Sequence, residues 1–201
     1  MLSSPADFLG RNDIRPTFLN RLQRLLHRMD EAYAKAAVHY GFHCDGCDDS
    51  CCRTRFYHHT HLEYLYLCTG FERLGAERRT EIRRSADRYC RALADAEKQN
   101  VALQRMCPLN FEGRCSLYEY RPMICRLHGI PHSLRPPGRG PVHGTGCEAF
   151  HRRCGHPSDV VFDRTPHYLQ LSELESEFMR AFGLNRRIKM TVAEMILHFQ
   201  E

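Results

Sequence analysis

Apolar residues recur at helical spacing along the first part of this 201-residue chain. Between Pro16 and Tyr40 they fall every three or four positions, which places them on one face of a helix. The pattern predicts a long amphipathic helix, and Gly41 is a typical stop signal for it. The positions predicted to face inward are Phe18, Leu22, Leu25, Leu26, Met29, Tyr33, Ala36, Ala37 and Tyr40.

Two further helices are predicted before residue 100. Thr60 and Glu63 form a Thr-x-x-Glu capping box, which is typical of a helix start. This second helix should end near Gly70 or Gly75. A third helix is predicted over about 77–98, where apolar residues again recur every three or four positions.

The pattern changes after residue 100, where short apolar pieces are broken by Pro108, Asn110 and Gly113. This predicts a turn or a small hairpin. Pro122 suits the first turn of a short helix. The proline- and glycine-rich stretch 129–146 is predicted to be irregular.

Two helices are predicted to close the chain, one over about 169–182 and one that starts at the capping box Thr191-x-x-Glu194. We therefore expect a mainly α fold, in which amphipathic helices surround an irregular cysteine-rich metal-binding region with at most a small β-hairpin.

The length predicts a single domain over 1–201. Its cysteine-cluster core should span about 40–150, with helical flanks over 11–40 and 160–201. No stretch approaches the roughly 20 apolar residues that cross a bilayer, so we expect no membrane association.

Eleven cysteines could serve disulfides or a soft metal. The first ten residues lack the apolar core of an export signal, so we expect a cytoplasmic protein, where thiols stay reduced. The odd number of cysteines also argues against complete pairing. These observations favour a metal.

The net charge of +5 comes with basic and acidic residues that alternate along the sequence. Such alternation is typical of solvated helix faces, so nucleic acid is an unlikely partner.

Four thiols lie close together in one loop, at Cys44, Cys47, Cys51 and Cys52. A Cys-x2-Cys turn lets two thiolates grip one ion. The adjacent Cys51 and Cys52 point in different directions, so one ion would not easily take both. The four cysteines therefore predict either two metal centres or one polynuclear cluster. Two four-ligand zinc sites would need eight thiols, which Cys107, Cys115, Cys125 and Cys147 would complete; an iron–sulfur cluster with spare thiols fits as well.

These motifs together resemble the YkgJ-type cysteine-cluster family, described as zinc- or iron-chelating domains. The resemblance covers about 40–150 and rests on Cys-x2-Cys-x3-Cys-Cys-Arg from Cys44, on Cys107-Pro-Leu, on Cys-Ser-Leu-Tyr-Glu-x-Arg-Pro-x2-Cys-Arg from Cys115, and on Cys147. The chain departs from the compact pattern in its long 129–146 loop and in an additional Cys154.

The resemblance implies a metal or iron–sulfur centre held by those eight cysteines, and it favours iron–sulfur over zinc. Some relatives look like the cluster part of flagellin lysine methylases, but no methyl-donor motif is present here, so that activity is not carried over.

Thiolate centres carry excess negative charge, which nearby cations stabilise. Arg121 and Arg126 stand beside predicted ligands and are expected to be such partners. Cys68 and Cys90 fall within predicted helices, where a small buried hydrophobe is the usual role. The rival nitrogen ligands that flank the cysteines are His43, His58, His59, His61, His128, His132 and His143.

We therefore expect a metal-binding cysteine-cluster protein whose iron–sulfur centre serves redox or modification chemistry. The alternatives are a zinc-stabilised module that binds a protein or nucleic acid, and a metal-handling protein. No paired carboxylates, Ser-His-Asp set or nucleotide site identifies a reaction, so the sequence leaves open whether the chain is an enzyme.

Overall fold

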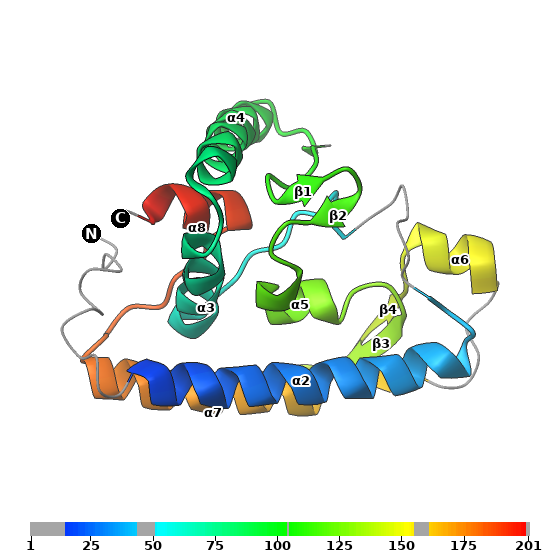
Figure 1. Cartoon of the computed structure of the whole chain (residues 1–201). Helices are drawn as coiled ribbons and strands as arrows, with labels where there is room; N and C mark the ends of the chain where they lie inside the picture. Colours follow the sequence, from blue (N-terminus) through cyan, green and yellow to red (C-terminus); the bar gives the residue numbers. More distant parts are fainter. Residues whose placement is uncertain (1–14, 44–50, 104, 155–160, 200–201) are drawn as a thin grey trace.

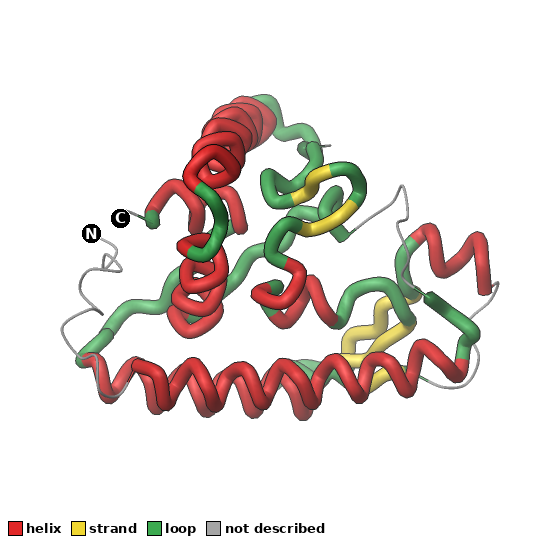
Figure 2. Tube along the Cα trace, in the orientation of Figure 1, coloured by secondary structure: helices red, strands yellow, loops and turns green. Residues whose placement is uncertain are grey.

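A computed structural model describes residues 15–43, 51–103, 105–154 and 161–199. The helices dominate it, and the strands are short (Figures 1 and 2). Helices α2 and α7 contact each other and form one layer along the base of the view. Helices α3, α4 and α8 form a second group above them, and strands β1 and β2 with helix α5 lie beside that group.

The helices are α2 (Arg15–His39), α3 (His61–Glu72), α4 (Ala76–Lys98), α5 (Met123–Arg126), α6 (Glu148–Cys154), α7 (Thr165–Phe182) and α8 (Val192–His198), with a 3₁₀ turn η1 (Tyr118–Tyr120). The strands are β1 (Asn110–Phe111), β2 (Arg114–Cys115), β3 (Pro131–Leu134), β4 (Val142–Thr145) and β5 (Phe162–Asp163).

Helix α3 lies between two hydrophobic clusters. On one side Leu62 and Leu65 join residues of α2, α5 and α7 in the first cluster. On the other side Leu67 and Phe71 join residues of α4, α8 and the β1–β2 region in the second. Because α3 is apolar on both sides, it connects the two groups of helices.

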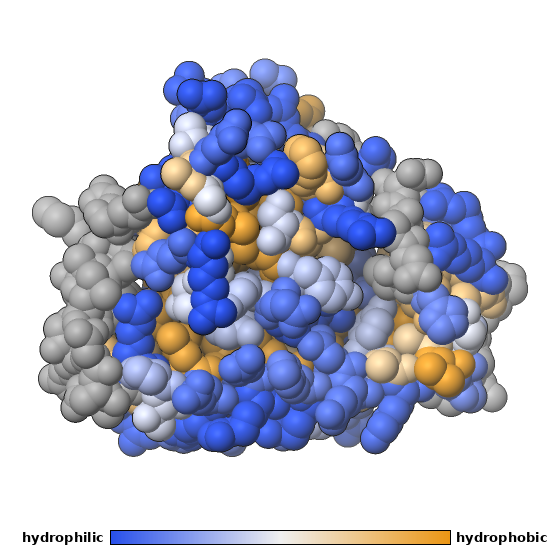
Figure 3. All heavy atoms as spheres, in the orientation of Figure 1, coloured by the Kyte–Doolittle hydropathy of each residue, from blue (hydrophilic) through white to orange (hydrophobic). Residues whose placement is uncertain are grey.

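The predicted helices agree with the structure to within a few residues. Thr60 accepts a hydrogen bond from the backbone N–H of Glu63 at the start of α3, and Thr191 forms a complete capping box with Glu194 at α8. Gly41, with φ of +62°, follows the end of α2. Hydrophilic side chains cover the outer face of α2, as its amphipathic pattern predicts (Figure 3). Helix α6 was not predicted.

The strands exceed the prediction of at most a small hairpin. Strands β1 and β2 form that hairpin, but β4, β3 and β5 form a second, three-stranded sheet. Strand β3 pairs antiparallel with β4 and parallel with β5. The prediction that 129–146 is irregular was therefore wrong for the residues of β3 and β4.

The prolines and glycines of this region occupy positions that a sheet tolerates. Pro131 is the first residue of β3, a position where a missing backbone N–H is tolerated. Gly144 lies opposite His132, and a Cβ atom at Gly144 would come within 2.1 Å of the His132 ring. The glycine thus makes room for the imidazole across the pair of strands.

A second close approach fixes η1 against α3. A Cβ atom at Gly70 would lie 2.3 Å from Cγ of Tyr120. Tyr120 also packs its ring on Tyr66, with ring centroids 4.9 Å apart. The segment that leads into α5 is therefore held directly against α3. Within the described residues, no helix is both long and apolar enough to span a membrane.

Candidate metal centre

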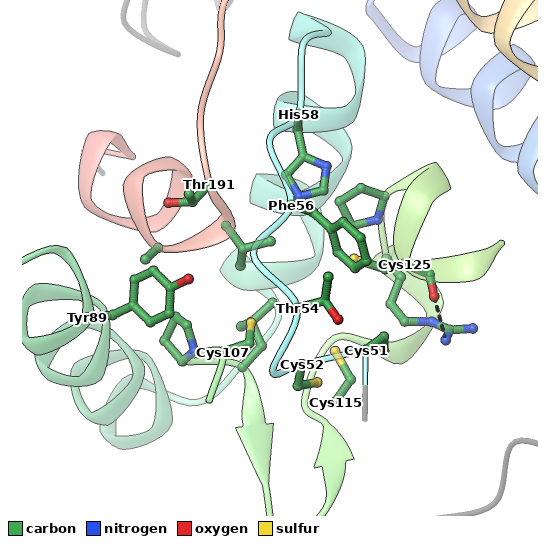
Figure 4. A pocket seen from close by; sticks show the side chains of 16 residues that line it. Cys51, Cys52, Thr54, Phe56, His58, Tyr89, Cys107, Cys115, Cys125 and Thr191 are labelled. Atoms are coloured by element: carbon green, nitrogen blue, oxygen red, sulfur yellow. Dashed lines mark hydrogen bonds between the residues drawn. The ribbon is translucent and has the colours of Figure 1, made fainter. Parts of the chain in front are cut away.

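Five of the eight predicted ligands line one cavity of about 50 Å³, here called the cysteine cavity (Figure 4). They come from the segment before α3, from the segment before β1, from β2 and from α5. A space of roughly 10–15 Å³ holds a water molecule, so this cavity can take a small inorganic group. The five cysteines are Cys51, Cys52, Cys107, Cys115 and Cys125.

The other three predicted ligands are Cys44, Cys47 and Cys147. Cys44 and Cys47 lie outside the described residues. Cys147 lines a second cavity, of about 330 Å³. Cys51 and Cys125 line this second cavity too, so they form a wall that the two cavities share.

Backbone hydrogen bonds bring the cysteine segments together. The N–H of Cys107 donates to the carbonyl of Cys52 over 2.7 Å. The N–H of Asn110 donates to the carbonyl of Cys107 over 3.0 Å, and Asn110 pairs with Cys115 across the hairpin. The main chain thus joins the distant segments that carry Cys52 and Cys107, and local turn and hairpin contacts connect Cys107 to Cys115.

Two buried carboxylates connect α7, α3 and α5 and so position Cys125. Glu175 on α7 accepts hydrogen bonds from the N–H groups of His61 and Leu62 at the start of α3, over 2.7 and 3.1 Å. Glu63 on α3 accepts in turn from the N–H of Met123 at the start of α5, over 2.8 Å. Unpaired N–H groups at helix starts favour a negative partner. Helices α3 and α5 therefore both begin on a carboxylate, and α5 carries Cys125 into the cavity wall.

The thiols of the cysteine cavity are poor acids. A hydrogen bond with Cys52, followed by burial, raises the pKa of both Cys51 and Cys107 well above the usual range. Burial and then the nearby Cys115 raise the pKa of Cys125, and burial raises the pKa of Cys115 to about 11. These four thiols are protonated at neutral pH in the absence of a metal. A metal that bound them would displace their protons, because the thiolate is the ligand.

The two predicted cationic partners, Arg121 and Arg126, take different positions. Arg121 lines both cavities, and its charge opposes the rise in the pKa of Cys51, Cys115 and Cys125, although burial and neighbouring thiols still dominate. It donates to the carbonyl of Cys125 over 3.5 Å. Arg126 is buried, forms an ion pair with Asp30 and donates to two backbone carbonyls.

In the described part of the chain, no three His, Cys, Asp or Glu side chains lie in a group that could hold a metal ion. The five cysteines share a cavity without adopting coordination geometry. Their chemistry is nevertheless that of a soft-metal donor set, since thiolates suit zinc and iron–sulfur clusters.

The remaining cysteines lie outside the cysteine cavity. Cys68 is buried in the second hydrophobic cluster, which confirms its predicted role as a small hydrophobe. Cys90 is half-buried and packs against the same cluster. Cys154, at the end of α6, packs against the first cluster.

Among the histidines, only His58 lines the cysteine cavity within the described residues. His61 instead contacts Glu175, with 2.8 Å between Nδ1 and Oε1. His128 lines the second cavity, and burial lowers its pKa to about 4. His59 and His143 are exposed, and His132 packs against Gly144. His43 is exposed, and its carbonyl accepts a hydrogen bond from Arg153.

Several residues of the cavity wall were not identified from the sequence. Tyr89 on α4 and the start of α8 at Val192 and Ala193 close one side, and Phe56 lies near Cys125 (Figure 4). Tyr89, Val192 and Ala193 are ordinary core-type residues on predicted helices, and no sequence signal separates them from the rest of the hydrophobic core. They give the cavity a largely apolar wall.

Comparison of the chain with models of protein families, with curated proteins and with solved structures found no match in any of the three. The resemblance to the YkgJ-type family stays a prediction that rests on the cysteine motif.

Proposed function

We propose that this chain is a metal-binding cysteine-cluster protein whose cysteine cavity holds an iron–sulfur centre. The observation that carries the proposal is the gathering of five cysteines from separate segments around one small cavity. Structural disulfides are a weaker account, because Cys51, Cys107, Cys115 and Cys125 are not joined in disulfides. The ligands of the centre would be Cys51, Cys52, Cys107, Cys115 and Cys125. Cys147, which lines the second cavity together with Cys51 and Cys125, would be an additional ligand.

The surroundings of the cavity support this assignment. Its apolar wall restricts water, and Arg121 supplies a positive charge beside three of the thiols. Outer hydrogen bonds and charges of this kind stabilise thiolate centres. An iron–sulfur centre supplies electron transfer or an open iron position, and its potential depends on such neighbours. The resemblance of the motif to the YkgJ-type family favours iron–sulfur over zinc.

A zinc-stabilised module is the second candidate, and one observation favours it. The strands β1 and β2, which lie among the cysteine segments, have only two residues each. Such a hairpin gains little stability from its own backbone pairing. A structural zinc ion could replace the missing core here, and the protein would then act by binding a partner.

Anaerobic purification followed by iron, zinc and acid-labile sulfide analysis tests the proposal. We expect brown protein with iron and sulfide in comparable amounts. Colourless protein with zinc, which unfolds on chelation, would establish the second candidate instead. Protein that binds a variable amount of several metals with no change in stability would indicate metal handling. A chain that holds no metal under any of these conditions would refute all three.

A matched pair of variants tests whether the metal binds in the cysteine cavity. Cys125→Ser removes a thiol that lines both cavities, whereas Cys90→Ser removes a half-buried thiol of α4 outside them. We expect Cys125→Ser to lose most of its metal and Cys90→Ser to keep the wild-type content. Equal metal contents in the two variants would place the binding site elsewhere.

A further inference from the structure

His58 presents a buried nitrogen atom with no partner. Its side chain is 2% exposed, and its Nε2 atom makes no hydrogen bond in the structure. The backbone is fixed, because His58 exchanges two hydrogen bonds with Met190, over 2.8 and 3.0 Å. The main chain at His58 is therefore fixed against the segment that leads into α8.

An unpaired buried polar atom of this kind calls for an explanation. Leaving such an atom without a partner costs about 1–3 kcal/mol, and native proteins rarely tolerate it unless a bound ion, ligand or water completes the site. Among the described buried side chains only a few other atoms share this condition. Of the residues that carry them, only His58 lines the cysteine cavity.

The ring is directed toward that cavity. In Figure 4 the tip of the His58 imidazole points down toward Phe56 and the side where Cys125 lies. The cavity wall includes His58 together with the five cysteines. His58 thus borders the space where the proposed centre would be bound, and it also lines a separate cavity of about 380 Å³ beside Glu63 and Met123.

We propose that His58 is a positioning residue, which donates a hydrogen bond from Nε2–H to a cysteine sulfur of the metal-loaded cavity. The inference rests on the proposed function, because the sulfur must be a thiolate to be a good acceptor. Thiolates around a metal carry excess negative charge, and an N–H donor disperses it.

The neighbouring residue provides a matched control. His59 is exposed and does not line the cysteine cavity. The test compares the wild-type protein with His58→Ala, His58→Gln and His59→Ala. Glutamine keeps an N–H donor but is a poor metal ligand, so it separates hydrogen bonding from coordination.

Retention of the native metal against a competing chelator is the first measurement. We expect His58→Ala to retain it about 10- to 100-fold less tightly, as is typical when an outer hydrogen bond to a ligand is lost. His58→Gln should recover most of this loss, and His59→Ala should match the wild type. The second measurement is the absorption of the loaded protein, with cobalt(II) in place of a colourless metal. The sulfur-to-metal bands should shift in His58→Ala and return in His58→Gln.

Three outcomes would overturn the inference. If His58→Ala retained the metal as tightly as the wild type, the Nε2 atom of His58 would make no hydrogen bond to the metal-loaded site. Equal losses in the alanine and glutamine variants would indicate coordination or a general structural role. If His58→Ala fails to fold, His58→Gln decides alone, and a tenfold loss in it counts against the donor role. A wild-type chain without metal would instead overturn the proposed function itself.

Discussion

The surroundings of α3 and the cysteine cavity both bring distant segments together, but they treat polar groups in opposite ways. Around the start of α3, the buried carboxylates Glu63 and Glu175 accept hydrogen bonds from backbone N–H groups. In the cysteine cavity, buried thiols gather around a shared space, and the Nε2 atom of His58 makes no hydrogen bond. This contrast is what a metal centre bound in the cysteine cavity, as proposed above, would explain.

The largest expected effect comes from removing a cavity thiol. Cys52 is the partner that dominates the pKa shifts of both Cys51 and Cys107, so it lies at the centre of the group. Cys52→Ser should lower metal retention by more than about 100-fold, beyond the usual effect of an outer residue. Chelator competition checks this, with Cys154→Ser as the control. Similar retention in both variants would break the comparison, because the cavity would then not be the binding region.

The second prediction concerns pH. Burial lowers the pKa of His58 to about 4 from an ordinary 6.5, so the unfolded chain binds the proton more readily between these values. Stability should be complete above about pH 6.5 and should fall as the pH drops toward 4, by on the order of 3 kcal/mol. Urea unfolding of the chelator-treated protein from pH 7 to 4 measures it. His58→Gln should show a shallower dependence, and an identical slope would contradict the assignment.

The third prediction tests the carboxylate connection between α3 and α5. Glu63→Ala leaves the N–H of Met123 without its acceptor, which should lower the free energy of unfolding by about 1–3 kcal/mol. Because α5 carries Cys125, metal retention should fall as well. The exposed Glu173 on α7 supplies the control, Glu173→Ala, which should change neither quantity. Loss of stability with unchanged metal retention would show that the two regions are independent.

The fourth prediction compares two glycines near α3. Gly70→Ala would push a Cβ atom into Tyr120, whereas a Cβ atom at Gly75 meets nothing within 4 Å. Overpacking should cost Gly70→Ala about 1–3 kcal/mol, and Gly75→Ala should change the stability only slightly. Thermal unfolding of both variants provides the measurement. Equal midpoints would mean that η1 does not need its close approach to α3.

The smallest expected effect is electrostatic. Arg121→Gln removes a positive charge beside three cavity thiols, and metal retention should fall by about tenfold. Arg114 is exposed on β2 next to Cys115, so Arg114→Gln controls for a change of net charge alone. Equal losses would show that only the overall charge matters.

The sequence predicted what depends on local spacing. Capping boxes and three-and-four apolar patterns placed α2, α3, α4, α7 and α8. The cysteine motif likewise selected five residues that share a cavity. Strands β3, β4 and β5 were missed, because a sheet of short strands depends on pairing between segments that no local pattern reveals. The role of His58 was hidden for the same reason, since a histidine before a capped helix looks ordinary until its nitrogen is seen without a partner.

The hydrogen bond between the N–H of Cys107 and the carbonyl of Cys52 has a consequence for assembly. It joins two thiol-bearing segments through the main chain, with no contribution from sulfur. This part of the cavity is therefore ordered without a bound metal, and the proposed centre would bind at a lower cost in conformational entropy than it would on a flexible loop.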